Sequence, residues 1–204
     1  MDLANASLDD VLREARACQL CVPHLPHLPR PVVKANKNAR LLIIGQAPGS
    51  KVHASGIPWD DPSGNRLRQW LGIGKAQFYD ESQVAIIPMG FCYPGKGRSG
   101  DLPPRPECAP QWHAALLSHL PNIKLTLLIG QYAQRYYLNT GFGKRHPTLT
   151  ATVAAWREYL PRYFVLPHPS PRNQIWLKKN PWFEGEVVGE LKSRVQIITS
   201  HNSG

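Results

Sequence analysis

The sequence predicts an α/β fold, a three-layer α/β/α sandwich around a central, four-stranded, mainly parallel sheet. Four short apolar runs alternate with stretches whose apolar residues recur at helical spacing, which is typical of α/β proteins. The runs are nearly continuous in apolar residues, as expected for parallel strands covered by helices on both faces. Because the chain has 204 residues and neither an internal repeat nor a linker, we expect one domain over residues 1–204.

The four expected strands end at residues that break regular structure. They cover residues 40–44, 84–88, 125–129 and 163–166. The first ends at Gly45 and the third at Gly130, and glycine lets the backbone turn sharply or come close to a ligand. The fourth runs into Pro169 and Pro171, which can continue neither a strand nor a helix interior. A loop is therefore predicted at the carboxyl end of each strand.

Several helix boundaries are marked by capping residues. Ser7 is a good N-cap, and Asp61 followed by Pro62 fits an N-cap and a first helical position. Gly72 ends that second helix. Further helices are expected to start at Cys108, at Gly130, near residue 150, at Gln174 and at Pro181, the last of them ending near Ile197.

Four loops are expected to meet at one edge of the sheet, because ligands of parallel sheets bind at the carboxyl ends of the strands. These loops are Gly45–Gly49, Met89–Tyr93, Gly130–Gln131 and His168–Asn173. His168 is notable because an imidazole can stabilise a developing anion near neutral pH. Each loop alone is equally well a tight turn, but their convergence predicts a ligand site.

The charge balance indicates a polyanionic partner. Lys and Arg number 24 against 14 Asp and Glu, which gives a formal charge of +10 and a pI of about 9.7. Nucleic acid is the commonest such partner, although the basic residues form no block and a merely basic protein fits as well. No apolar run reaches the length of a membrane span, and the start, Met1–Ala4, lacks the apolar core of a signal peptide. We expect a cytoplasmic protein.

The four cysteines form two pairs. Cys18 and Cys21 make a CxxC motif, whereas Cys92 and Cys108 lie far apart along the chain. In a reducing compartment, metal ligation or burial as free thiols is favoured over disulfides. Four thiolates can hold a zinc ion or an iron–sulfur cluster, and the spacing favours neither.

These motifs together resemble the uracil-DNA glycosylase superfamily, most closely its bacterial and archaeal family-4 type, which carries a [4Fe-4S] cluster. The resemblance rests on the CxxC motif, the loop GQAPG at Gly45–Gly49, an aromatic residue after proline at Trp59, the second cysteine pair and the sequence HPS at His168. It covers the chain from about residue 15 to its end. It implies a monofunctional DNA glycosylase of base excision repair, acting as a monomer on DNA.

The resemblance also implies roles for individual residues. The four cysteines would ligate the [4Fe-4S] cluster, with zinc as the alternative. His168 would donate to an oxygen of the flipped-out base, on which Trp59 would stack. The first loop would lie near the sugar and the attacking water; it consists of Gly45, Gln46, Ala47, Pro48 and Gly49. The residues expected to contact DNA are Ser170, Arg172 and Asn173.

The chain departs from the family pattern in the first loop. Gln46 stands where family-4 enzymes have glutamate, and Ala47 stands where other members have Asp or Asn. The loop therefore has no carboxylate, and Gln46 can position water but is a poor proton acceptor. We expect Asp60 to supply the missing carboxylate and Asp61 to serve as a helix cap.

A second departure concerns base recognition. Pro88 replaces the asparagine that reads uracil in the family, so the base is expected to be read by the backbone near Met89–Phe91, including Gly90, or by another part of the chain. Uracil, hypoxanthine, xanthine or a modified base all fit this reading. His53 follows the first loop, where a related subgroup has a histidine that bonds covalently to DNA. Without that subgroup's basic insertion, we expect His53 to contact DNA or solvent.

Two other classes of function compete with the enzyme. A non-catalytic or weakly active DNA-binding member of the same fold would explain the missing carboxylate of the first loop. A zinc-binding α/β protein unrelated to DNA would explain the cysteines alone. The matched loops contain no lysine for a Schiff base, so lyase activity is not expected.

Overall fold

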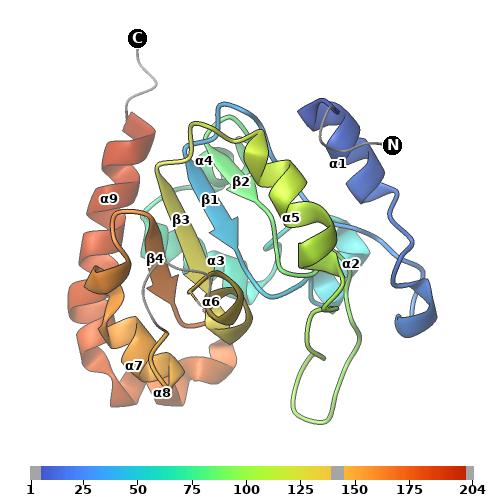
Figure 1. Cartoon of the computed structure of the whole chain (residues 1–204). Coiled ribbons are helices and arrows are strands. Elements are labelled where there is room, and N and C mark those ends of the chain that lie inside the picture. The colour runs from blue at the N-terminus through green and yellow to red at the C-terminus, as the bar shows by residue number, and fades with distance from the viewer. Residues whose placement is uncertain (1–5, 139–144, 201–204) are drawn as a thin grey trace.

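A computed structural model of the chain describes residues 6–138 and 145–200. Met1–Ala4, used above to argue against a signal peptide, lie outside the described residues. The described chain forms one four-stranded sheet with helices on both sides (Figure 1). Its strands are β1 (Leu41–Ile44), β2 (Val84–Ile86), β3 (Leu125–Ile129) and β4 (Tyr163–Leu166). The predicted α/β class and the four strands are confirmed.

The strand order β2-β1-β3-β4 places the expected loops together. Every neighbouring pair is parallel, with Leu41 beside both Val84 and Leu125. The chain passes from β1 to β2 on one side and then to β3 on the other side of β1. A crevice is expected where the strand order reverses in this way, at the carboxyl ends of β1 and β3. The loops after β1 and β4 border this crevice.

β2 ends two residues earlier than predicted. The N–H of Ile87 still donates to the carbonyl of Ile43 at 3.0 Å, but Pro88 has no N–H with which to continue the ladder. The sheet therefore ends at Pro88 on this side. From there the chain enters a long loop that reaches α5.

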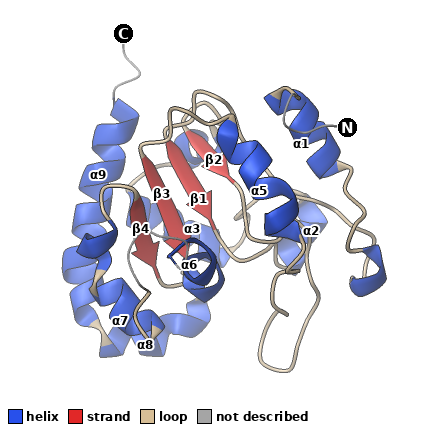
Figure 2. Ribbon diagram, in the orientation of Figure 1, coloured by secondary structure: helices blue, strands red, loops and turns tan. Residues whose placement is uncertain are grey.

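The helices lie on both faces of the sheet, as Figure 2 shows. They are α1 (Leu8–Arg16), α2 (Ser50–Ser55), α3 (Pro62–Leu71), α4 (Lys75–Tyr79), α5 (Cys108–Ser118), α6 (Gly130–Leu138), α7 (Leu149–Ala154), α8 (Gln174–Lys179) and α9 (Val188–Ser200). In the view of Figure 1, α5 lies in front of the sheet and α3 lies behind it. In the described part of the chain, no helix is long and apolar enough to cross a membrane.

Most predicted helix boundaries are confirmed by their caps. Ser7 forms a capping box with Asp10 at the start of α1. The Asp61 carboxylate accepts the N–H of Gly64 at 2.7 Å at the start of α3, and Gly72 ends that helix in the left-handed conformation. These side chains satisfy backbone groups that a helix end leaves unpaired.

Other helix predictions need correction. α2 and α4 were not predicted, because each begins after a glycine that offers no side-chain cap. The helix expected around residues 150–160 splits into α7 and a 3₁₀ turn over Trp156–Tyr159. The last helix begins with a π-helical segment, Phe183–Val187, before α9.

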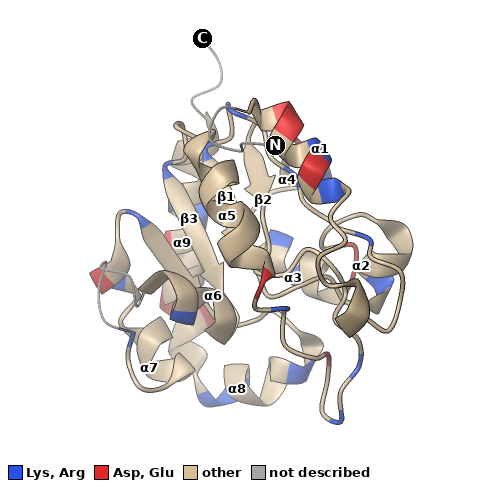
Figure 3. Cartoon of the chain, turned by 45° about the vertical axis from the view of Figure 1, so that its right-hand side comes forward, with Lys and Arg blue, Asp and Glu red and all other residues tan. Residues whose placement is uncertain are grey.

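The loop between β2 and α5 projects beyond the carboxyl ends of the strands, on the side where the crevice is expected (Figure 1). Its middle folds back as a hairpin over Gly95–Leu102, in which the N–H of Leu102 donates to the carbonyl of Gly95 at 2.8 Å. Figure 3 shows basic residues at the outer end of this loop and on α8. Two of the positively charged parts of the surface thus lie at the carboxyl edge of the sheet.

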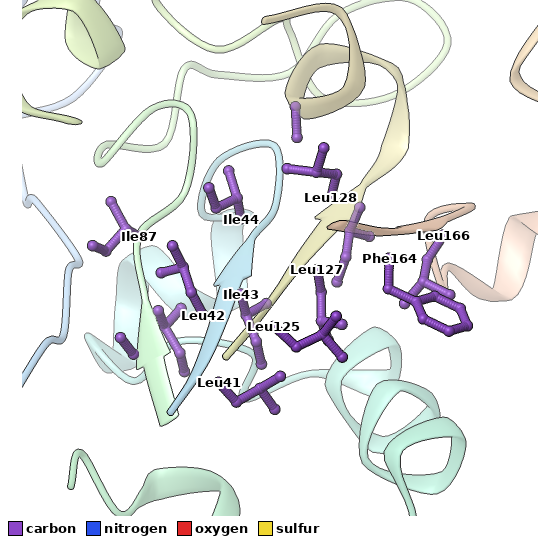
Figure 4. Packing of buried hydrophobic residues seen from close by; sticks show 14 of the residues in the cluster. Leu41, Leu42, Ile43, Ile44, Ile87, Leu125, Leu127, Leu128, Phe164 and Leu166 are labelled. Atoms are coloured by element: carbon purple, nitrogen blue, oxygen red, sulfur yellow. The ribbon is translucent and has the colours of Figure 1, made fainter. Parts of the chain in front are cut away.

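The strands form the centre of the core. All residues of the four strands are buried, and Ile43, Ile44, Leu127 and Leu128 expose none of their surface. Figure 4 shows these side chains packed on both sides of β1 and β3. Burying a large aliphatic side chain contributes about 1.5–3 kcal/mol. This continuous burial explains why the strands lack an alternating pattern of polar residues.

A buried histidine anchors the end of β2. His113 of α5 is 2% exposed, and its Nε2–H donates to the carbonyl of Pro88 at 3.0 Å. Its Nδ1 then accepts the hydroxyl of Tyr137. Burial lowers the pKa of His113 to about 4, with the Pro88 bond opposing the shift. His113 is therefore uncharged at neutral pH and fixes the start of the long loop.

We expect His113 to make the fold acid-sensitive. Its pKa of about 4 in the folded state lies below the ordinary value of 6.5, so between these values the unfolded chain binds more protons. Stability should fall as the pH drops from about 6.5 to about 4, by up to about 3 kcal/mol from this group. Urea unfolding at several pH values measures the effect. His113→Gln should flatten the pH dependence, and His119→Gln on the same helix should not; equal slopes for both variants would contradict this assignment.

Candidate active site

A cavity of about 370 Å³ opens at the carboxyl edge of the sheet. Its walls come from the loop after β1, the segment before α3 and the loop after β4. Cavities of this size hold small ligands in many proteins. Of the residues predicted for the site, nine line it: Gly45, Gln46, Ala47, Pro48, Gly49, Trp59, His168, Ser170 and Arg172. Asp60, Met89, Gly90, His53 and Asn173 do not line it.

Trp59 forms one wall of the cavity in a strained backbone conformation. Its φ is 57°, a left-handed backbone conformation that no other non-glycine residue adopts in the described part of the chain. A Cβ on Gly45 would lie 2.8 Å from the indole, and a Cβ on Gly64 would lie 1.8 Å from the Trp59 carbonyl oxygen. Only glycine fits at either position. The two glycines thus let the indole and its backbone sit directly against the first loop and α3.

Arg68 supports Trp59 from inside the fold. This arginine is only 7% exposed, and its guanidinium donates to the Trp59 carbonyl at 3.3 Å. The same group donates to Asn65 Oδ1 and Tyr79 Oη. A buried cation needs such partners to offset its lost hydration. Arg68 therefore fixes the strained turn that presents the indole.

His168 lies beside Trp59 in the wall of the cavity. The two ring centroids are 5.7 Å apart with an interplanar angle of 31°. Burial lowers the pKa of His168, while the nearby Asp61 carboxylate acts in the opposite direction. The imidazole is therefore uncharged at neutral pH and offers one N–H donor. The side-chain amide of Asn173 donates to the His168 carbonyl at 2.7 Å and holds the loop, although Asn173 itself lies outside the cavity wall.

The backbone expected to bind the base is already engaged. The N–H of Met89 donates to the carbonyl of Gly45, and that of Gly90 donates to the carbonyl of Gln46, each at 2.9 Å. The N–H of Phe91 points to the Cys108 sulfur at 3.3 Å. None of the three is a free donor in this structure. Pro88 is the residue of this segment that reaches the cavity.

The carboxylates of the cavity differ from the predicted one. Asp60 does not line the cavity, whereas Asp61 and Asp101 do. Asp61 acts as the cap of α3, as predicted. Asp101 comes from the hairpin of the long loop. The side-chain amide of Gln46 holds this hairpin by donating to the Leu102 carbonyl at 3.3 Å. No local sequence signal marks Asp101, because only the folding of the loop brings it to the first loop.

His53 lies beside the cavity in an aromatic cluster. Its ring centroid is 5.3 Å from that of His27 and 5.9 Å from that of Tyr93. It is half-buried, and its Nδ1 is buried with no hydrogen-bond partner. Burial, and then the charges of His27 and Arg30, lower the pKa of His53. The expectation of a solvent-exposed His53 is wrong, because its neighbours cover the ring.

The four cysteines line a second, smaller cavity of about 20 Å³. Cys18 and Cys21 come from the N-terminal segment, Cys92 from the long loop and Cys108 from α5. Burial raises the pKa of the Cys92 thiol to about 11 and that of Cys108 to about 12. Arg105 also lines this cavity. Within residues 6–138 and 145–200, no three Cys, His, Asp or Glu side chains form a ready ligand group for a metal ion.

Comparison with known families identifies the fold. The family model described as "Uracil DNA glycosylase superfamily" matches residues 33–192, well over half of the chain. The chain belongs to the uracil DNA glycosylase superfamily. The matched region contains the cavity residues from Gly45 to Arg172, whereas Val32, which also lines the cavity, precedes it. It also contains Cys92 and Cys108, whereas Cys18 and Cys21 precede it.

A curated relative in the superfamily is the "Type-4 uracil-DNA glycosylase" of Archaeoglobus fulgidus. The two sequences are 26% identical over 136 residues. The alignment covers 65% of this chain and 64% of the relative, so the chain spans somewhat under two thirds of the length of the protein it matches. The similarity agrees with the resemblance to the family-4 type read from the motifs.

Within this superfamily fold, we expect Gly64 to be required for the position of Trp59. Gly64→Ala would place a Cβ 1.8 Å from the Trp59 carbonyl oxygen, and the turn would have to move. The free energy of unfolding should fall by more than about 1 kcal/mol. Gly189→Ala on α9 is the matched control, because its Cβ would meet nothing within 4 Å. It should raise the free energy of unfolding by about 0.5–1 kcal/mol. Urea unfolding distinguishes the two; equal stability would contradict the tight contact.

Proposed function

We propose that the chain is a monofunctional DNA glycosylase of base excision repair, which flips a uracil or another deaminated or damaged base out of DNA and hydrolyses its N-glycosidic bond. The observation that carries this proposal is the cavity beside the first loop, whose wall holds Trp59 and His168 next to each other. It offers an aromatic face and a neutral N–H donor in one space. Family membership supports the same reaction.

Trp59 and His168 offset the two energy costs of the reaction, which are base extrusion and the charge left on the departing base. Extruding a base costs a few kcal/mol, and stacking on an aromatic side chain returns about 1–3 kcal/mol. When the glycosidic bond breaks, the electrons of the bond pass to the base. A neutral His168 can donate its N–H to an oxygen of that anionic base and stabilise it. Trp59 therefore holds the base, and His168 lowers the energy of its departure.

The sugar side of the cavity is formed by the first loop. Gly45, Ala47, Pro48 and Gly49 line it with backbone and small groups, which leaves room for a deoxyribose. Gln46 donates its side-chain N–H to Leu102, so its side-chain oxygen remains to orient a water. We place the attacking water here. Which base fits best is set by the space around Pro88, since this residue offers no side-chain hydrogen bond.

DNA would lie across the carboxyl edge of the sheet. Ser170 and Arg172 line the cavity mouth, and Asn173 holds their loop through the His168 carbonyl. Basic residues also lie on α8 and at the outer end of the long loop (Figure 3). His53 lies at the same edge. The net charge of +10 suits a phosphate backbone, and we propose a monomer that acts in the cytoplasm.

For the cysteines we propose a [4Fe-4S] cluster, with zinc as the alternative. Four thiols around one cavity form the donor set of such a cluster, and the Phe91 N–H to the Cys108 sulfur is a hydrogen bond typical of cluster ligands. The cluster would supply a structural link between the N-terminal segment and α5.

A non-catalytic or weakly active DNA-binding role is the second candidate. The observation that favours it is the first loop, in which neither Gln46 nor Ala47 carries a carboxylate. Such a protein would keep the cavity and the basic edge without turnover. The excision assay below separates the two functions.

Single-turnover excision on labelled oligonucleotides tests the proposed reaction. The panel holds uracil, hypoxanthine, xanthine and undamaged bases, in single and double strands at low salt, because phosphate contacts weaken as salt rises. We expect cleavage of at least one deaminated base, and a loss of about 100-fold or more for His168→Ala. His119→Ala is the matched control. Tight binding with no cleavage of any substrate would favour the non-catalytic role.

Iron, sulfide and zinc analysis of anaerobically purified protein tests the cluster. We expect a brown protein that absorbs near 400 nm, with about four iron atoms per chain. Cys108→Ala should lose the colour and lower the stability, since three ligands remain and a buried link is broken. A colourless protein with stoichiometric zinc, prepared without oxygen, would contradict the cluster.

A further inference from the structure

The reaction proposed above needs a carboxylate that the first loop lacks. Hydrolysis of an N-glycosidic bond builds positive charge on the sugar and requires a water to lose a proton. In the described part of the chain, the acidic residues that line the cavity are Asp61 and Asp101. Their positions in the cavity differ, and this difference decides which of them suits the sugar.

Asp61 already has another role. Its carboxylate accepts the Gly64 N–H at 2.7 Å and so completes the first turn of α3. It is also the charge that acts on His168. His168 is the group that faces the departing base, where negative charge develops. A carboxylate beside that base would repel the developing charge, so Asp61 is better suited to capping the helix and orienting the imidazole.

The hairpin of the long loop brings Asp101 to the part of the cavity wall beside the first loop. The hairpin, Gly95–Leu102, is closed by the Leu102 N–H, which donates to the Gly95 carbonyl. An isolated antiparallel β-bridge joins the backbones of Lys96 and Asp101. The Gln46 side chain donates to the Leu102 carbonyl at 3.3 Å and so ties the hairpin to the first loop. The residue next to Asp101 is therefore fixed against the loop that lacks a carboxylate.

The Asp101 carboxylate itself lies against Gly49. Its Oδ2 is 3.3 Å from the place that a Cβ on Gly49 would occupy. No described residue forms an ion pair or hydrogen bond with this carboxylate, although basic side chains are common on this edge. Asp101 is an exposed residue at the edge of the cavity, so its carboxylate is accessible to a water or a cation.

We propose that Asp101 replaces the missing carboxylate of the first loop, in place of the predicted Asp60. This inference rests on the proposed function. As the bond between C1′ and the base nitrogen breaks, its electrons pass to the base, and the carboxylate stabilises the positive sugar. The water oxygen then bonds to C1′, and its proton passes to Asp101. Gln46 orients that water, and the base leaves as an anion beside His168.

The hairpin also touches the DNA-binding loop. Arg172 Nη1 lies 2.9 Å from the place of a Cβ on Gly100, the residue before Asp101. The same hairpin therefore contacts the first loop on one side and Arg172 on the other. A DNA strand that engages Arg172 would press on the segment that carries the carboxylate. Asp101 is thus delivered by an element that spans the mouth of the cavity.

The test compares Asp101→Asn, Asp61→Asn and Asp60→Asn in the full chain, with Asp9→Asn on α1 as the matched control. Single-turnover excision of the best base should fall by about 100-fold or more in Asp101→Asn, the range of general base catalysis, with DNA affinity retained. Asp101→Glu should restore part of the rate. An unchanged rate in Asp101→Asn would overturn the inference. So would a loss of about 100-fold in Asp60→Asn that Asp101→Asn does not show.

A binding measurement keeps the inference separate from the proposed function. Oligonucleotides carrying a cationic pyrrolidine in place of the sugar mimic the charged transition state, and a neutral tetrahydrofuran is the matched control. The wild type should bind the cation more tightly, and Asp101→Asn should lose this preference. If the wild type excises no base yet keeps the preference, the proposed function fails and the placement of Asp101 stands. No preference in the wild type, or the same preference in Asp101→Asn, would overturn it.

Discussion

The indole of Trp59 occupies the space that side chains on two other residues would need. A Cβ on Gly45 would meet the ring at 2.8 Å, and one on Gly64 would meet the carbonyl at 1.8 Å. This packing holds a left-handed backbone that costs about 1–3 kcal/mol for a non-glycine residue. Arg68 supports it from the interior. Because the indole and the neighbouring His168 both line the cavity, the shape of the cavity depends on this contact.

The segment after β2 links the two cavities of the molecule. Pro88 reaches the larger cavity, whereas Phe91 and Cys92 line the cavity of the cysteines. His113 fixes the Pro88 carbonyl, and the N–H groups of the following residues bond to the first loop and to the Cys108 sulfur. A group bound by the cysteines would therefore stiffen the same segment that borders the larger cavity.

Local sequence signals predicted the elements that they control. Continuous apolar runs located the strands, and Asp61 and Gly72 marked the ends of α3. The strand-end rule placed Gly45–Gly49 and His168 at one edge. The misses have a different origin. Asp101 reaches the cavity through hairpin contacts within the long loop, and the N–H groups of Met89 and Gly90 are used by the first loop. Such long-range contacts leave no periodic pattern, so the sequence pointed to Asp60 beside Trp59 and gave no sign that Asp101 lines the cavity.

The central claim is that a base leaves the DNA stack and enters the cavity that Trp59 and His168 line. A crystal structure with an oligonucleotide whose target nucleotide carries a 2′-fluorine, which resists hydrolysis, tests this claim most directly. The account predicts a flipped nucleotide with its base stacked on the Trp59 indole, the His168 N–H at a base oxygen and the sugar against Gly49 and Asp101. A nucleotide that stays in the DNA stack, or a base bound elsewhere on the protein, would contradict it.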